Sequence, residues 1–219
     1  WTQRQSDGAG GVLLSSLLAG DTDEAACRFR EPGWYAERGI DLRTGAPVAA
    51  IDREARTVRV GDDDLPYDTL VLAIGSNPIR LPKPGADLPG IVAFRDLAHV
   101  EEMRRVAKPG ARAVVIGGGL LGLEAAYGLA RLGIEATLVH VMDRLMERQL
   151  DTRAGRLVLA AMEQKGVRVI LGGDTAEFTG RDAVTGVRLA DGRHLPVDLV
   201  VVAVGVRPNV ELARQAGLD

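Results

Sequence analysis

Three glycines, Gly117, Gly119 and Gly122, have a spacing that suits the binding of a diphosphate group. In this spacing the first glycine permits a sharp turn, the second lets the backbone approach a diphosphate closely, and the third lets a helix pack tightly on a strand. An apolar run, residues 114–116, precedes the glycines, and a helix-forming segment, residues 120–132, follows them. Amides at the start of a helix lack partners within it and, together with the helix dipole, attract anions. The residues therefore predict a strand, a tight turn and a helix whose amino end binds the diphosphate of a dinucleotide.

The elements around these glycines matter, because a glycine pattern of this kind is a weak signal alone. Gly133 ends the predicted helix, and a second short apolar run, residues 136–141, follows it. The segments complete the strand–helix–strand unit that a dinucleotide fingerprint requires. We therefore assign the glycines and the amides of Leu120 and Leu121 to the diphosphate of NAD(P)H, with a purely structural glycine turn as the alternative.

His140 stands at the end of the second predicted strand, where a carboxylate would bind the adenosine ribose hydroxyls and repel a 2′-phosphate. An imidazole does not exclude a phosphate, and Arg144 nearby would attract one, whereas Asp143 would oppose it. The choice between NADH and NADPH therefore stays open, as does an exposed His140 without a cofactor role. Val204 and Gly205 follow an apolar strand, where open α/β sheets bind ligands. They are expected to offer backbone groups to the nicotinamide amide, with a core turn as the alternative.

The composition limits the classes of function open to the chain. Its 219 residues, 46% of them hydrophobic, suffice for one large or two modest domains. The net charge of -3 and the lack of a basic block argue against nucleic-acid binding. Cys27 is the only cysteine, which excludes an internal disulfide, a redox thiol pair and a cysteine cluster, and predicts a small semi-buried thiol. No apolar run is long enough to span a bilayer, no metal site is predicted, and a reducing, cytoplasmic setting fits.

Short helices and strands are expected on both sides of the glycine-rich unit. Glycines close two short helical segments near the start, and Asp, Gly and Pro separate several short runs rich in β-branched residues. Asp96 is placed to cap a helix that leads into the glycine-rich unit and ends before Pro109. The predicted helices are residues 12–18, a segment around Trp34 and Tyr35, and residues 96–108; the predicted strands are residues 40–42, 48–51, 57–60 and 70–74.

Two stretches of the chain resemble each other at a constant offset of 130 residues. Each contains a small antiparallel region, then an apolar strand, a glycine and a proline. We infer an internal duplication of a nucleotide-binding unit, with a chance similarity of two strand-and-turn segments as the alternative. Moved back by the same offset, Gly117 falls before residue 1, so the glycine loop of the first unit is expected to precede the chain. The matched pairs are Pro66 and Pro196, Asp68 and Asp198, Gly75 and Gly205, and Pro78 and Pro208.

The glycine run and the two strand–glycine–proline segments, in this order, resemble the FAD-dependent pyridine-nucleotide oxidoreductases. Four motifs are more specific and resemble the large subunit of bacterial NAD(P)H nitrite reductases. The most specific of them contains Met146-Glu147-Arg148-Gln149-Leu150-Asp151. The four motifs are Leu13 to Gly20, Phe94 to Leu97, Gly117 to Ala126, and Leu145 to Asp151.

The resemblance implies that the intact protein passes electrons from NAD(P)H through FAD to downstream iron–sulfur and siroheme domains that reduce nitrite to ammonium. It places Glu124 near the nicotinamide and the flavin edge, although a carboxylate in the first turns of a helix also suits the dipole or the solvent. Ile74 stands where many relatives have threonine. The serines and the arginine among the flavin-side positions would serve equally well as solvated surface residues. By resemblance the flavin-side positions are Ser15, Ser16, Ile74, Gly75 and Arg95.

The predicted fold is α/β, with a Rossmann-like NAD(P)-binding domain inserted in a partial FAD-binding domain of related fold and with small antiparallel sheets. The expected domains are residues 1–84 for the partial FAD-binding domain, 85–206 for the NAD(P)H-binding domain and 207–219 for the return to the first. The expected function is electron input to an NAD(P)H-dependent nitrite reductase. The alternatives are a rubredoxin or ferredoxin reductase, an NADH oxidase, and a nucleotide-binding module that is inactive alone. The oligomeric state, a homo-oligomer included, stays open.

Overall fold

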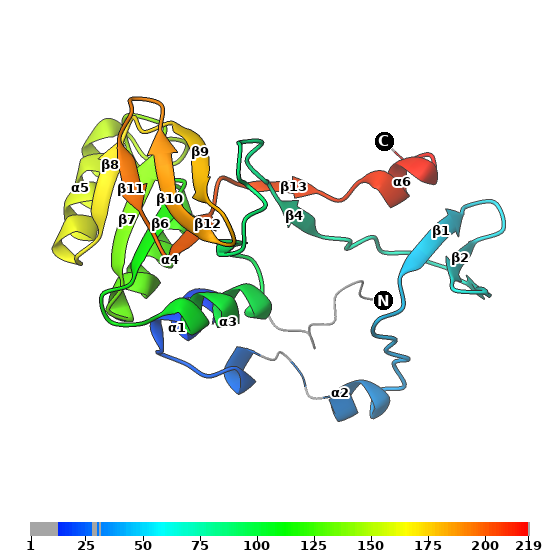
Figure 1. Ribbon diagram of the computed structural model, residues 1–219. Helices are drawn as coiled ribbons and strands as arrows, with labels where there is room; N and C mark the ends of the chain where they lie inside the picture. Colours follow the sequence, from blue (N-terminus) through cyan, green and yellow to red (C-terminus); the bar gives the residue numbers. More distant parts are fainter. Residues whose placement is uncertain (1–12, 28–29, 31, 219) are drawn as a thin grey trace. The chain divides into compact units, whose positions relative to one another are not determined.

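The computed structural model describes residues 13–27, 30 and 32–218 (Figure 1). These residues form two compact units. No helix in the described part of the chain combines the length and the apolar character needed to cross a membrane. The larger unit comprises residues 13–27 and 78–205, and the smaller comprises residues 30, 32–77 and 206–218.

A five-stranded parallel sheet is the centre of the larger unit. The strand order is β5-β12-β6-β7-β8. Strands β7 and β8 follow β6 on one side of it, and β12, which comes later in the chain, pairs with β6 on the other side. Helix α4 connects β6 to β7, which confirms the predicted strand–helix–strand unit, and α5 connects β7 to β8. The elements are β5 Ile91–Ala93, β6 Arg112–Ile116, α4 Leu120–Arg131, β7 Glu135–His140, α5 Thr152–Gln164, β8 Arg168–Leu171 and β12 Leu199–Val202.

Local sequence signals set the starts of the helices in this unit. The Asp96 carboxylate accepts a hydrogen bond from the His99 amide at 3.1 Å and caps α3, Leu97–Val106, as predicted. Asp151 caps α5 in the same way through the Ala154 amide at 2.8 Å. Helix α4 differs, because its N-cap residue is a glycine and no side chain caps its first amides.

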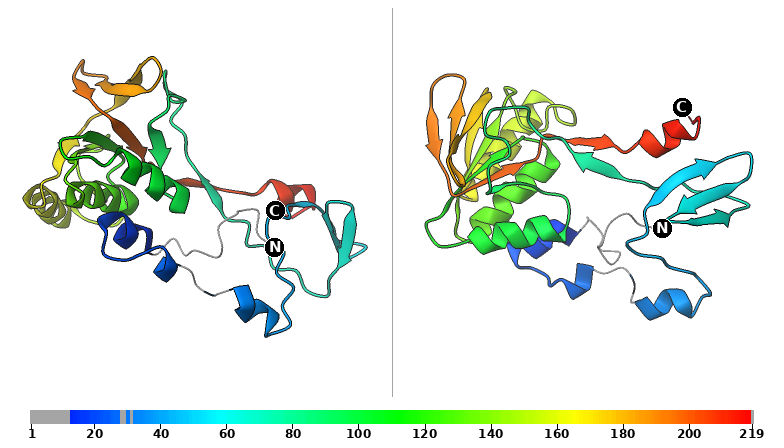
Figure 2. Two further views of the ribbon diagram at one scale, coloured as in Figure 1. Left: turned by 60° about the horizontal axis from the view of Figure 1, so that its bottom comes forward. Right: turned by 45° about the vertical axis from the view of Figure 1, so that its right-hand side comes forward.

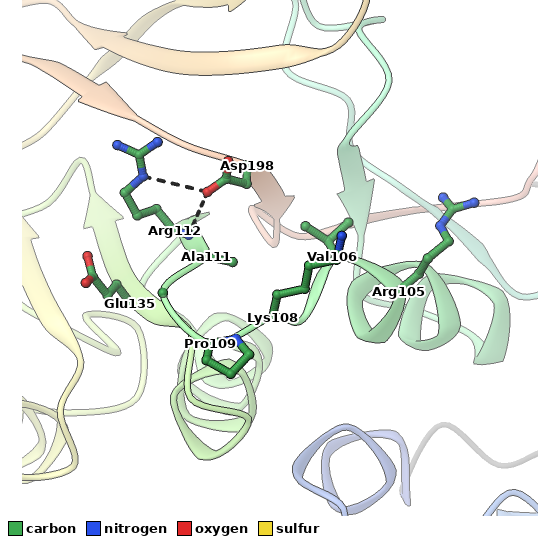
Figure 3. Close-up of a pocket in the computed structure, with 9 residues that line it drawn as sticks. Arg105, Val106, Lys108, Pro109, Ala111, Arg112, Glu135 and Asp198 are labelled. Atoms are coloured by element: carbon green, nitrogen blue, oxygen red, sulfur yellow. Dashed lines mark hydrogen bonds and ion pairs between the residues drawn. The ribbon is translucent and has the colours of Figure 1, made fainter.

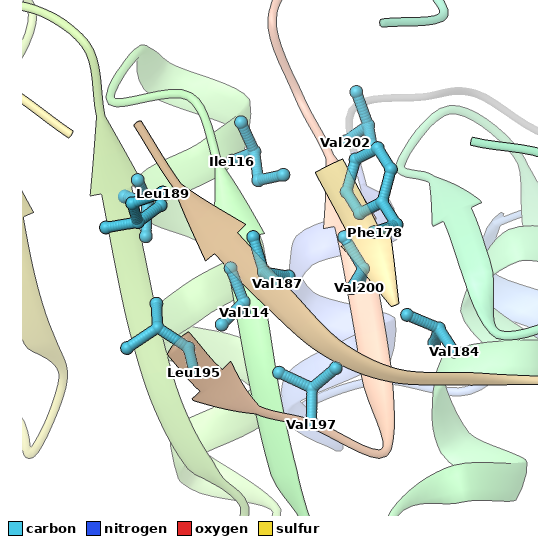
Figure 4. Packing of buried hydrophobic residues seen from close by; sticks show 11 residues of the cluster. Val114, Ile116, Phe178, Val184, Val187, Leu189, Leu195, Val197, Val200 and Val202 are labelled. Carbon is cyan, nitrogen blue, oxygen red and sulfur yellow. The ribbon is translucent and has the colours of Figure 1, made fainter. Parts of the chain in front are cut away.

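Different elements cover the two faces of the parallel sheet (Figure 2). A three-stranded antiparallel sheet, β9-β10-β11, packs Phe178 and Val187 against Val114 and Val200 (Figure 4). Alternate residues such as Val115 point to the other face, where α3 and α4 contact the sheet. Burial on both faces explains the nearly continuous apolar runs of β6 and β12. The antiparallel strands are β9 Thr175–Gly180, β10 Val184–Leu189 and β11 His194–Pro196.

A short helix, α1, Leu14–Ala19, packs against α4 and α3. Its Leu18 is fully buried, and a Cβ on Gly128 of α4 would lie 2.9 Å from the Leu18 side chain. Gly20 ends the helix in the left-handed conformation, with a φ of 79°. The prediction of a helix closed by this glycine is confirmed, although residue 12 of the predicted segment lies outside the described residues. The short 3₁₀ helix η2, Ala25–Cys27, follows.

The smaller unit contains a three-stranded antiparallel sheet, β1-β2-β3. Strands β1 and β2 confirm two of the predicted strands, and helix α2 confirms the helical segment around Trp34. β4 pairs with β13 in a separate two-stranded sheet, and α6 contacts β1. The bounds are α2 Pro32–Ala36, β1 Val48–Asp52, β2 Thr57–Val60, β3 Asp63–Pro66, β4 Ser76–Pro78, β13 Val206–Pro208 and α6 Glu211–Gln215.

The order of elements repeats along the chain. Each copy has a three-stranded antiparallel sheet and, further along the chain, a short strand, but in the second copy β12 lies between them. The short strands, β4 and β13, start 130 residues apart (206 minus 76). The strands predicted at residues 40–42 and 70–74 are wrong, because neither range forms a strand and Val71 is 81% exposed. A strand needs a neighbour to pair its backbone groups, and no strand in the described residues pairs with residues 70–74.

The two units divide the chain at different points from the predicted domains of residues 1–84, 85–206 and 207–219. The larger unit includes residues 13–27, because α1 packs on α4 and α3. It resumes at residue 78 and ends at residue 205. The sequence pattern does not reveal contacts between helices that are distant in sequence. These contacts explain why residues 13–27 belong to the larger unit.

Candidate functional site

The glycine-rich turn between β6 and α4 needs glycine at its first and third positions. Gly117 has a φ of 117°, and a Cβ there would lie 2.4 Å from the Ala203 carbonyl oxygen. A Cβ on Gly122 would lie 1.8 Å from the Gly117 carbonyl oxygen. Both distances are far shorter than van der Waals contact, so side chains are excluded at these positions. A Cβ on Gly119 would have no neighbour within 4 Å, so the backbone there faces open space.

The amino end of α4 presents backbone amides without a competing side chain. Gly119 is the N-cap residue, and no side chain makes a capping bond. The Leu123 amide donates to the Gly119 carbonyl at 3.0 Å, which is the first hydrogen bond of the helix. Leu120 and Leu121 are 59% and 38% exposed. The amides ahead of position 123 have no partner within the helix and, with the helix dipole, can bind an anion.

The end of β12 adjoins the glycine turn. The Ala203 amide donates to the Ile116 carbonyl at 2.8 Å, and a Cβ on Gly117 would lie 3.2 Å from the Val204 nitrogen. The turn and this strand end therefore meet at the carboxyl ends of β6 and β12. This is a topological switch point, because β7 and β8 follow β6 on one side of it and β12, which comes later in the chain, pairs with it on the other side. Open α/β sheets bind their ligands at such a point. Val204 is half-buried, and Gly205 is exposed with a φ of 115°.

His140, at the end of β7, is buried against the glycine turn, with 7% of its surface exposed. Its Nδ1 accepts a hydrogen bond from the Gly118 amide at 3.1 Å, so the proton of the neutral ring is on Nε2, which lies 3.0 Å from the Glu147 carboxylate. The alternative of an exposed His140 is therefore wrong. Burial raises the pKa of Glu147, but hydrogen bonds from a backbone amide and from His140 outweigh burial and hold the pKa below its usual value.

Arg144 lies on the segment after β7 and is partly exposed. Its guanidinium lies 3.3 Å from the Asp143 carboxylate and donates to the Glu147 carbonyl oxygen at 3.3 Å. Asp143 is the more exposed partner, with 82% of its side chain accessible. A positive and a negative group thus stand side by side at the edge where the sequence leaves the choice of dinucleotide open.

Four residues in or next to the turn had no role in the sequence-based prediction: Gly118, Leu145, Met146 and Glu147. A Cβ on Gly118 would lie 2.6 Å from the His140 ring and 2.8 Å from the Leu145 side chain. The Met146 amide donates to the Gly118 carbonyl oxygen at 2.9 Å. The sequence offered one indication that Met146 matters, because it belongs to the motif that most specifically resembles the nitrite reductases.

Helix α1 contacts the expected nicotinamide-side carboxylate. The Ser15 hydroxyl donates to the Glu124 carboxylate at 2.6 Å. Both residues are half-buried, so neither is a freely solvated surface residue. Ser16 and Arg95 are half-buried in the same unit.

Ile74 and Gly75 belong to the smaller unit. The Asn209 side chain donates to the Ile74 carbonyl at 2.9 Å, and the Asn209 amide donates to the Gly75 carbonyl at 3.0 Å. Gly75 has a φ of 68°, which suits glycine. These bonds fix the turn before β4, and the flavin-side role of the two residues stays a prediction.

An open depression of about 710 Å³ lies at the opposite end of the parallel sheet (Figure 3). Lys108, Glu135 and Asp198 contribute to its wall, and the Arg112 amide donates to the Asp198 carboxylate at 2.9 Å. These residues precede or begin β6, β7 and β12, so they mark the amino ends of the strands. Ligands of open α/β sheets bind at the carboxyl ends, so the fold favours the glycine turn over this depression.

A parallel sheet with a glycine turn after its central strand β6, at the topological switch point, defines a dinucleotide-binding fold. Comparison with known proteins gives the family. The chain belongs to the pyridine nucleotide-disulphide oxidoreductase family, whose model matches residues 9–219.

Among curated relatives, the chain is 46% identical over 208 residues to nitrite reductase [NAD(P)H] of Bacillus subtilis (strain 168), covering 94% of this chain and 26% of the relative. It is 37% identical to the ferredoxin–NAD(+) reductase component of the biphenyl dioxygenase system of Paraburkholderia xenovorans (strain LB400), covering 94% of this chain and 51% of the relative. Among solved structures, a ferredoxin reductase from Rhodopseudomonas palustris superposes with a TM-score of 0.92 at 33% identity, covering 99% of this chain and 54% of that one. The chain thus spans about a quarter of the nitrite reductase and about half of each ferredoxin reductase.

Proposed function

We propose that this chain is the electron-input part of an NAD(P)H-dependent nitrite reductase, the part that binds NAD(P)H beside FAD. The glycine turn is the observation that supports binding most directly, because Gly119 leaves open space in front of uncapped helix amides. Similarity at 46% identity to a nitrite reductase supports the choice of reaction. The single cysteine argues against reduction of a disulfide by a thiol pair in this chain.

The residues of the chain bind and orient the dinucleotide. The amides of Leu120 and Leu121 donate to the diphosphate, and the missing side chain of Gly119 lets the diphosphate approach the backbone. Backbone groups of Val204 and Gly205 face the nicotinamide amide. Ser15 holds the Glu124 carboxylate on the nicotinamide side. NAD(P)H supplies a hydride and FAD accepts it when both are bound, so the protein contributes position rather than a nucleophile.

In the intact protein, the electrons would be passed on to further domains. Downstream iron–sulfur and siroheme domains would receive the electrons and reduce nitrite, in a cytoplasmic enzyme. A ferredoxin reductase is the second candidate, because one relative of that class is 37% identical over 94% of this chain. In that case the electrons would pass to a separate iron–sulfur protein instead of to domains of the same chain.

Calorimetric titration of the purified chain with NADH and NADPH in parallel tests the binding step. We expect saturable binding of at least one dinucleotide, and much weaker binding of AMP, which lacks the diphosphate. Absence of binding by both dinucleotides would refute the proposal.

Visible absorbance tests the electron-input step. We expect the chain, after incubation with FAD and removal of excess, to retain flavin absorbance that NADH bleaches in the absence of oxygen. A chain that binds NADH but retains no flavin would instead be a nucleotide-binding module, inactive alone.

A further inference from the structure

We propose that His140 and Glu147 form a buried clamp that fixes the central peptide of the glycine turn. His140 would then be a positioning residue for dinucleotide binding and would act through Gly118 instead of touching the ribose or a 2′-phosphate. This inference rests on the proposed dinucleotide-binding function of the turn.

Both polar groups of Gly118 are held by the chain that ends and follows β7. Its amide donates to Nδ1 of His140 at 3.1 Å, and its carbonyl accepts from the Met146 amide at 2.9 Å. Gly118 stands between the two glycines that shape the turn and directly precedes Gly119. The orientation of the next amides therefore depends on how Gly118 is held.

The His140 ring also fills the space next to the turn. A Cβ on Gly118 would lie 2.6 Å from two ring atoms, so ring and backbone are in direct contact. The side chain is 8% exposed, and both ring nitrogens have protein partners. A ring placed in this way has no free nitrogen to offer a ribose hydroxyl or a phosphate.

Glu147 sets the tautomer of the ring. Its carboxylate lies 3.0 Å from Nε2 and accepts the proton there, which leaves Nδ1 as the acceptor for Gly118. The Glu147 side chain is itself 23% exposed, so the pair is screened from most of the solvent. The same arrangement, in which a second group on one ring nitrogen fixes the role of the other, orients histidines in metal and catalytic sites.

Substitution of His140 by residues that keep or lose an acceptor tests the clamp. Asparagine can place its Oδ1 near the position of Nδ1, whereas leucine has similar bulk and no acceptor. We expect His140→Leu to raise the Kd for NADH about tenfold, the effect of one lost hydrogen bond, and His140→Asn to stay within about threefold of the wild type. His194→Asn, at an exposed histidine of β11, is the matched control and should leave the Kd unchanged.

A second measurement covers the case in which His140→Leu does not fold. In ¹⁵N-labelled wild-type protein we expect a scalar coupling across the hydrogen bond between the Gly118 nitrogen and Nδ1 of His140, and ring shifts of the Nε2-protonated tautomer. A folded His140→Leu variant with wild-type affinity, a folded His140→Asn variant that binds as weakly as His140→Leu, or absence of the coupling would overturn the clamp. Wild-type protein that binds neither dinucleotide would refute the proposed function instead, and the coupling would still report on the clamp.

Discussion

Gly119 and Gly122 lie in the same turn, but a methyl group added to each would meet different surroundings. In Gly122→Ala the new Cβ would lie 1.8 Å from a backbone oxygen, so we expect destabilisation of about 2–3 kcal/mol and loss of NADH binding. In Gly119→Ala it would meet nothing within 4 Å, so stability should change by less than about 1 kcal/mol. Affinity for NADH should still fall, because the methyl group would occupy the space in front of the amides. Thermal unfolding and calorimetry separate the two effects, and a Gly119→Ala variant with wild-type affinity would show that the diphosphate does not approach there.

Arg144 offers a test of dinucleotide choice at a single side chain. If its guanidinium pairs with a 2′-phosphate, Arg144→Ala should weaken NADPH binding about tenfold and leave NADH binding nearly unchanged. Arg148→Ala is the control, since Arg148 is 87% exposed and lies 4.0 Å from Glu147. Equal losses for NADH and NADPH in Arg144→Ala, measured by parallel titrations, would remove Arg144 from phosphate recognition.

Glu147 should make the stability of the chain depend on pH in the acid range. Its pKa is lower in the folded protein than in the unfolded chain, where it is about 4.3, so its contribution is fully present above that value and is lost as the pH falls through the folded-state pKa. We therefore expect Glu147→Gln to reduce the free energy of unfolding at neutral pH and to reduce it less below about pH 4. Urea denaturation of both proteins across this range measures the difference, and a difference that does not vary with pH would contradict the assignment.

At the scale of elements, the contact of α1 with α4 joins the beginning of the described chain to the parallel-sheet unit. Leu18 is fully buried in this contact, so Leu18→Ala should lower the free energy of unfolding by about 2–4 kcal/mol. Leu157→Ala on α5 is the matched control, because Leu157 is 69% exposed and its loss should change stability by less than about 0.5 kcal/mol. Similar effects of the two substitutions in urea denaturation would show that α1 does not pack stably on α4.

Local determinants explain which elements could be predicted from the sequence. The strand, turn and helix around Gly117 follow from neighbouring residues, and Asp96 and Gly20 mark helix ends by their own chemistry. No local sequence pattern indicated the contacts between distant residues. His140 is 22 positions from Gly118, and Ser15 is 109 positions from Glu124. These distant contacts bury His140 and bring α1 into the larger unit.

Pairing partners explain the elements that were predicted wrongly. Residues 70–74 have the apolar character of β12, but β12 lies between β5 and β6, which satisfy its backbone on both sides. No strand in the described residues offers the same pairing to residues 70–74. The match in sequence nevertheless holds for the next element, because β4 and β13 start 130 residues apart.

At the scale of the whole molecule, the division into two units places all the predicted dinucleotide contacts in one of them. The glycine turn, the end of β12 and the His140–Glu147 pair all belong to residues 78–205. Ile74 and Gly75 belong to the other unit. Binding of NADH should therefore stabilise one unit more than the other.

Hydrogen exchange measured by mass spectrometry tests this division. At about a hundred times its Kd, a ligand that binds only the folded unit stabilises it by about 2.7 kcal/mol. Amides of β6, β7 and β12 lie in the buried central sheet, so we expect them to exchange through opening of the whole unit and to slow by roughly a hundredfold. Amides of β1, β2 and β3 should exchange at nearly the same rate with and without NADH. Equal protection of both sheets would mean that the two units open together, and protection of β1 to β3 alone would place the dinucleotide in the smaller unit.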